Sequence, residues 1–87
     1  MTSTRAHRAE DLSDALYKSL PTASPSVDRY RNQGVWDQAV LEALAIFAST
    51  VQPLPSDVRQ MVQETIEDPN VSPKFRGQVI RYLVRIP

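Results

Sequence analysis

The chain has 87 residues, of which ten are Lys or Arg and ten are Asp or Glu, so its formal net charge is zero. A chain of this length forms one small domain, which buries only about 60% of its unfolded surface. The absence of cysteine excludes a disulfide framework, a zinc ribbon and a thiol nucleophile. The balanced charge argues against a dedicated nucleic-acid binder, because such domains are usually basic.

The N-terminal residues predict an amphipathic helix from about Arg5 to Ser19. Apolar residues recur there at intervals of three and four, as on one face of a helix, and Pro21 ends the pattern. The segment lacks the apolar stretch of a secretory signal, so a cytoplasmic location is the default expectation. The single histidine, His7, has no evident partner that would orient a general base, and we interpret it as a surface residue.

A loop rich in Pro and Ser follows this helix and predicts a division of the chain into residues 1–25 and 26–87. The first helix then either closes a helical bundle or projects loosely toward a partner. Beyond the loop, Ser26 is a plausible N-cap for a turn over Val27–Arg31. We expect a break or kink near Gly34, since glycine readily adopts the left-handed conformation that ends helices.

The stretch from Val35 to Val51 is the most informative part of the chain, because it is apolar nearly all round. A helix of this kind has to be covered, either by the rest of the chain or by a second molecule. We predict a helix over Val35–Thr50 that ends before the prolines at 53 and 55. The stretch is too short and too interrupted by charge to span a bilayer.

Two further helices complete a predicted all-α fold, with three core helices and the N-terminal helix beside them. Ser56 caps a helix over Asp57–Glu67, and Ser72 caps a helix over Pro73–Ile86. Short links that contain proline favour antiparallel packing, with Val35–Thr50 in the middle. The predicted core consists of Trp36, Val40, Leu44, Phe47, Val58, Met61, Val62, Ile66, Phe75, Val79, Tyr82 and Leu83.

The last predicted helix carries a basic stripe, which is the most promising candidate for a binding site. The chain from Lys74 onward contains no acidic residue. One interpretation is that Glu67 and Asp68, just before this helix, neutralise a merely solvated face. The other is that the stripe binds an acidic protein patch or a phosphate backbone. The residues of this stripe are Lys74, Arg76, Arg81 and Arg85.

A second candidate for partner binding is the pair Tyr30 and Arg31. Aromatic and arginine side chains are enriched in the hot spots of protein interfaces. Trp36 and Tyr82 fall on predicted core faces, so we expect both to be buried. Tyr30 lies beside a loop between two arginines, and we expect it to be an exposed anchor.

The sequence contains no Gly-rich phosphate loop, nucleophile elbow or His-Glu-x-x-His motif. We therefore expect neither enzymatic activity nor a cofactor, metal ion or small-molecule substrate. The expected function is that of a protein–protein interaction module: a regulator, adaptor, inhibitor or accessory subunit. Its partner would be another protein or a second copy, and Ala39, Leu41 and Ala43 would permit close helix approach.

The alternative function is that of a small helical regulator that binds nucleic acid through the basic stripe. A helix-turn-helix would consist of Asp57–Glu67 and Pro73–Ile86. Such motifs usually have a turn of three or four residues that often contains glycine. Here the link is longer and lacks glycine, so the pattern supports this alternative only weakly.

Overall fold

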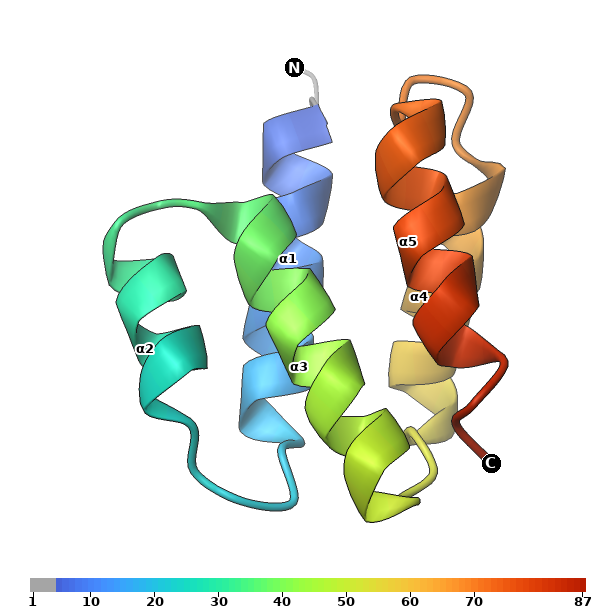
Figure 1. The fold of residues 1–87 in the computed structure, drawn as a ribbon. Coiled ribbons are helices and arrows are strands. Elements are labelled where there is room, and N and C mark those ends of the chain that lie inside the picture. The colour runs from blue at the N-terminus through green and yellow to red at the C-terminus, as the bar shows by residue number, and fades with distance from the viewer. Residues whose placement is uncertain (1–4) are drawn as a thin grey trace.

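The computed structural model describes the backbone of residues 5–87 and the side chains of residues 8–87. The described chain is all-α, as predicted, and Figure 1 shows α3 crossing the bundle between α2 on one side and α4 and α5 on the other. The helices are α1 (Arg5–Lys18), α2 (Pro25–Asn32), α3 (Trp36–Thr50), α4 (Ser56–Glu67) and α5 (Pro73–Leu83).

Helix α3 is central, as its apolar character predicts, and it contacts α1, α2 and α5. The helices of this chain therefore supply much of the cover that its apolar surface requires. Ala39, Leu41 and Ala43, which we expected at an intermolecular contact, are buried inside the molecule. The buried residues of this helix are Ala39, Val40, Leu41, Ala43, Leu44 and Phe47.

Helix α1 closes the bundle, which is the first of the two arrangements considered for it. Its Leu12 and Leu16 are fully buried, and the helix packs against α3 and α4. Helix α4 in turn packs mainly against α1 and α5. Whether residues 1–25 behave as a separate unit in solution stays a prediction.

Helix α2 begins earlier than predicted, because Ser24 rather than Ser26 is its cap. The Ser24 Oγ accepts a hydrogen bond of 3.2 Å from the backbone N–H of Val27. Pro25 follows at the first helical position, where its fixed φ and missing N–H cost nothing. The expected turn is therefore a helix of two turns. The break at Gly34 is confirmed, with a positive φ of 71°.

The starts and ends of the last two helices also differ in part from the prediction. Ser56 is the first residue of α4 rather than its cap, and Pro55 precedes it without a side-chain capping bond. The Ser72 cap of α5 is confirmed, with a hydrogen bond of 3.2 Å from the Phe75 N–H. Helix α5 ends at Leu83 instead of Ile86, because the N–H groups of Arg85 and Ile86 bond to carbonyls three residues back, in a tighter turn.

The predicted core is confirmed in its centre and wrong at its edges. Trp36 is half-buried at the first turn of α3 and does not belong to the core cluster. Four further predicted core residues are only partly buried: Met61, Ile66, Tyr82 and Leu83. The core instead includes residues from α1, α2, the links and the C-terminal turn, among them Leu12, Leu16, Val27, Leu54, Val71 and Ile86.

Candidate interaction site on helix α5

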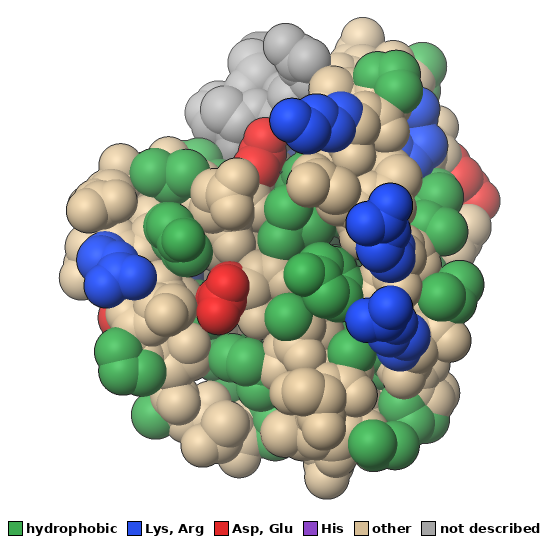
Figure 2. Space-filling model, in the orientation of Figure 1, with side chains coloured by type: hydrophobic (Ala, Val, Ile, Leu, Met, Phe, Trp, Pro, Cys, Tyr) green, Lys and Arg blue, Asp and Glu red, His purple; other side chains and the backbone are tan. Residues whose placement is uncertain are grey.

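Helix α5 and the turn after it present a continuous exposed surface, which we call the outer face of α5. The helix packs its Phe75 and Val79 into the core, so residues on the opposite side of the helix point to solvent. Figure 2 shows Lys and Arg side chains in a row along this part of the molecule, with hydrophobic side chains beside them. The outer face consists of Lys74, Gly77, Ile80, Arg81, Val84 and Arg85, all of them exposed.

Two hydrophobic side chains on this face lack cover. Ile80 is 39% exposed and Val84 is 77% exposed, and their spacing of four residues places them one above the other. Neither residue was predicted to belong to a binding site, because a single apolar stripe, on the core side, was expected for this helix. The signal was available, since Ile80 and Val84 lie outside the spacing that joins Phe75, Val79 and Ile86.

The three cations on this face, Lys74, Arg81 and Arg85, form no ion pair with any described side chain. We expected Glu67 and Asp68 as possible neutralising partners. Asp68 instead pairs with Arg8 at 2.8 Å, and Glu67 accepts a hydrogen bond of 3.0 Å from Gln63. The outer face therefore carries positive charge that the described part of the chain does not balance through direct pairs.

Arg76 belongs to the predicted basic stripe, but the structure gives it a different role. Its Nε donates to the Ile66 carbonyl at 2.7 Å, and its Nη2 donates to the carbonyls of Asp68 and Val71 at 2.7 and 3.0 Å. These bonds satisfy backbone oxygens at the end of α4 and in the link to α5. Arg76 therefore stabilises the fold, and we remove it from the candidate binding residues.

The Arg31 side chain likewise makes its contacts within the molecule. Its Nη2 lies 2.9 Å from Asp14 Oδ1, and its guanidinium lies over the Tyr17 ring at 4.4 Å from the centroid. Both contacts join α2 to α1. Tyr30, which we expected to be exposed, is half-buried, with the Arg29 guanidinium 5.8 Å from its ring centroid. The pair Tyr30 and Arg31 is therefore a weaker interface candidate than the outer face of α5.

The polar cluster around Arg31 shifts the pKa values of two side chains. A hydrogen bond from Lys18 and the positive charges of Lys18 and Arg31 lower the pKa of Asp14 below its ordinary value, although partial desolvation opposes them. The Asp28 carboxylate raises the pKa of the Tyr17 hydroxyl. Contacts within α1 and between α1 and α2 explain both shifts without a ligand.

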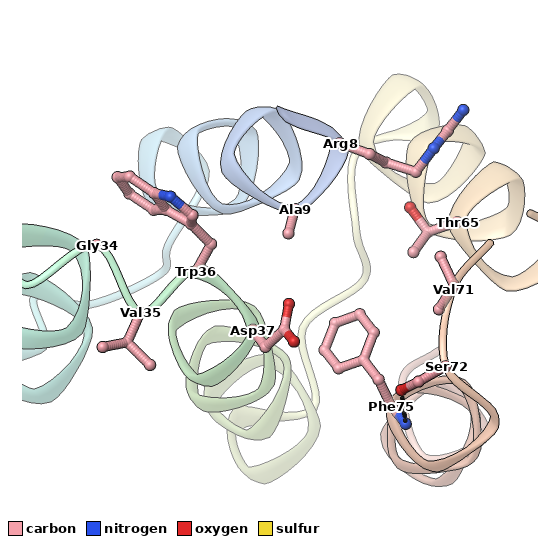
Figure 3. A pocket seen from close by; sticks show the side chains of 10 residues that line it. All are labelled: Arg8, Ala9, Gly34, Val35, Trp36, Asp37, Thr65, Val71, Ser72 and Phe75. Atoms are coloured by element: carbon pink, nitrogen blue, oxygen red, sulfur yellow. Dashed lines mark hydrogen bonds between the residues drawn. The ribbon is translucent and has the colours of Figure 1, made fainter. Parts of the chain in front are cut away.

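A hollow of about 430 Å³ lies between the first turns of α1 and α3 and the link before α5. Figure 3 shows the Asp37 carboxylate turned into it, toward the Phe75 ring, whereas the Arg8 side chain points away. Asp37 and Arg8 are the charged residues among its lining. Arg8 is paired with Asp68, so among the described residues the hollow offers one carboxylate without a second group for acid–base chemistry.

The remaining sequence candidates add no second site among the described residues. The side chain of His7 lies outside the described residues. Within the described part of the chain, no three His, Cys, Asp or Glu side chains gather as metal ligands would. None of the described helices combines the length and the apolar character that crossing a membrane requires.

Comparisons with protein-family models, curated proteins and solved structures give no match for this chain. Its function is therefore argued from its own residues and their geometry. On the outer face of α5, exposed hydrophobic side chains and cations without ion-pair partners among the described side chains lie together.

Proposed function

We propose that this chain is a small, non-enzymatic protein–protein interaction module that binds its partner through the outer face of α5. It would serve as a regulator, adaptor, inhibitor or accessory subunit, in the cytoplasm by default. The observation that carries the proposal is the combination of uncovered Ile80 and Val84 with cations that lack a carboxylate partner in the described chain. Arginine is one of the residues that are enriched in interface hot spots.

The apolar surface of α3 is not the proposed binding surface, because α1, α2 and α5 cover most of it. It follows that a partner would bind a folded domain rather than complete an unfinished core. Self-association stays a prediction, and it would use a surface other than Ala39, Leu41 and Ala43, which are buried. Sedimentation at micromolar concentration tests it, because a dimer would give a mass that rises with concentration.

The experiment that tests the function is affinity capture from the native host with three forms of the chain. The first is wild type, and the second is the triple variant Lys74→Glu, Arg81→Glu and Arg85→Glu. The third is the matched control Arg29→Glu, which reverses an exposed charge on α2. We expect a protein retained by wild type and control but lost by the triple variant. The same set of captured proteins from all three forms would contradict the proposal.

Nucleic-acid binding is the second candidate function, because the same unpaired cations would suit phosphates. In that case each phosphate contact should add about one unit to the slope of log affinity against log salt. A gel shift at low salt with mixed-sequence duplex and single strands separates the two functions. Tight binding that is lost on Arg81→Glu would favour nucleic acid, and no shift would favour a protein partner.

A further inference from the structure

The outer face of α5 has a gap at its centre, because Gly77 is exposed in the interior of the helix. Glycine is among the least favourable residues for a helix interior. The fold does not require it here, since its φ is not positive and an added Cβ would meet no atom within 4 Å. The missing side chain therefore serves no packing purpose within the described molecule.

The residues next to Gly77 on this side of the helix carry larger side chains. Lys74 lies one turn before it, and Ile80 and Arg81 lie one turn after it on the same side of the helix. Helix axes pack 8–10 Å apart, and the side chains at the crossing point set the distance. A glycine at that point allows the closest approach, with Ile80 and Val84 available to pack beside it.

We infer that the partner presents an amphipathic helix with acidic residues along one border of its apolar stripe, and that this helix crosses α5 at Gly77. The inference rests on the proposed function and adds the chemistry of the partner. The apolar stripe would pack on Ile80 and Val84. The acidic border would lie against Lys74, Arg81 and Arg85, which lack carboxylate partners among the described side chains.

Charge and shape select this occupant over three others. A second copy that used the same face would bring one basic row against another, since residues 73–87 contain no acid. Phosphates would match the cations but would leave Ile80 and Val84 uncovered. A lipid surface is usually bound by helices that insert bulky Trp, Phe or Leu side chains, whereas this face has a glycine at its centre. An acidic amphipathic helix matches the cations and the apolar pair, and it can approach α5 closely at Gly77.

The test uses a displayed library of helical peptides with an apolar stripe and with Glu, Gln or Lys at the positions that border it. Peptides are selected on the full chain and then measured on wild type, Gly77→Leu and the triple variant Lys74→Glu, Arg81→Glu and Arg85→Glu. We expect selected peptides to carry Glu along one border. We expect their affinity to fall about tenfold or more on Gly77→Leu, because the added side chain blocks the crossing.

Melting temperature distinguishes a blocked crossing from a damaged fold. Leucine favours helix over glycine, so Gly77→Leu should melt at or above the wild-type temperature while it loses peptide binding. The matched control is Gln60→Leu, which adds the same side chain at an exposed position on α4 and should leave binding unchanged.

The two proposals fail in different ways. If selected peptides bind Gly77→Leu as tightly as wild type, the crossing at Gly77 is wrong and the proposed function stands. If no peptide depends on Lys74, Arg81 and Arg85, the acidic helix is wrong as the partner, whereas the proposed function fails only if affinity capture returns the same proteins from all three forms of the chain. Selection of peptides bordered by Lys, or preferential binding to mixed-sequence duplex or phosphatidylserine vesicles at physiological salt, would also overturn the inference.

Discussion

Arg31 of α2 and Asp14 of α1 are 17 residues apart in the sequence, yet their side chains form an ion pair at 2.9 Å. The pair joins the short second helix to the first, and Lys18 binds the other oxygen of the same carboxylate at 3.1 Å. The Tyr17 ring below the Arg31 guanidinium adds a cation–π contact. This cluster joins α2, which has only eight residues, to α1, in addition to the packing of α2 against α3.

The cluster predicts a pH dependence of stability. Because the pKa of Asp14 is lower in the folded chain than its ordinary value of 3.8, its ionised form stabilises the fold above that value. This contribution is lost as the pH falls through the lowered pKa. Unfolding titrations at several pH values should therefore show a difference between wild type and Asp14→Asn that shrinks below about pH 4.

The size of this effect is limited by solvent. The Asp14 side chain is 46% exposed, so we expect it to contribute less than about 1 kcal/mol at neutral pH. Asp57→Asn is the control, since Asp57 is exposed and forms no ion pair with a described side chain. A pH profile of Asp14→Asn that parallels wild type throughout would contradict the role assigned to this pair.

Arg76 should matter for stability rather than for binding. Removal of its guanidinium in Arg76→Ala leaves the carbonyls of Ile66, Asp68 and Val71 without their donor. We expect a loss of about 2–3 kcal/mol in the free energy of unfolding, measured by chemical denaturation. Arg81→Ala is the control, because an exposed side chain without such bonds should change stability by less than about 0.5 kcal/mol. Equal effects of the two substitutions would show that the carbonyl bonds contribute little.

Phe47 tests the centre of the core. It is 2% exposed in the middle of the apolar cluster, so Phe47→Ala should cost about 3–5 kcal/mol. This loss is comparable to the whole stability of a domain of this size, roughly 3–5 kcal/mol. Trp36→Ala should cost less, because Trp36 is half-buried outside that cluster. Thermal unfolding followed by circular dichroism measures both, and a larger loss for Trp36→Ala would contradict this view of the core.

The two glycines should respond to alanine in opposite directions. Gly34 ends α2 with a φ of 71°, where alanine is strained, so Gly34→Ala should lower stability by about 1 kcal/mol. Gly77 lies in a helix interior with free space around it, so Gly77→Ala should raise stability by up to about 1 kcal/mol. Chemical denaturation of both variants checks the signs, and a loss of stability in Gly77→Ala would show that the fold itself needs this glycine.

The helices could be predicted from the sequence because the residues that begin and end them act locally. Pro21, Gly34 and the pair Ser72-Pro73 mark helix ends through backbone geometry that depends on a few neighbouring residues. How deeply a side chain is buried in the bundle depends instead on residues that are distant in the sequence. Trp36 has the large apolar side chain of a core residue, but it lies on the first turn of α3, where the neighbouring helices bury it only in part.

The candidate site was predictable in outline and not in detail. The acid-free C-terminal segment indicated a basic surface, and Lys74, Arg81 and Arg85 are indeed exposed. The sequence could not indicate that the Arg76 side chain would turn to backbone carbonyls five to ten residues earlier, because that requires the path of the link before α5. Ile80 and Val84 were within reach of the sequence, because they lie outside the spacing that joins Phe75, Val79 and Ile86.

Val51 provides the last prediction, because it ends α3 in a left-handed conformation with a φ of 55° and a ψ of 43°. A β-branched residue is strained there by about 1–2 kcal/mol, whereas glycine is not. The Val51 side chain is 66% exposed, so its removal sacrifices little packing. Glycine also gives the unfolded chain more freedom, which offsets part of the gain. We therefore expect Val51→Gly to raise the free energy of unfolding by about 1 kcal/mol or slightly less.

The matched control for Val51→Gly is Val84→Gly, which removes an exposed valine from a right-handed helical conformation with a φ of −66°. No strain is relieved there, so only the cost of added freedom in the unfolded chain remains. Chemical denaturation should show Val51→Gly more stable than wild type and Val84→Gly less stable. If both substitutions lower stability by the same amount, the left-handed conformation of Val51 imposes no measurable cost on the fold.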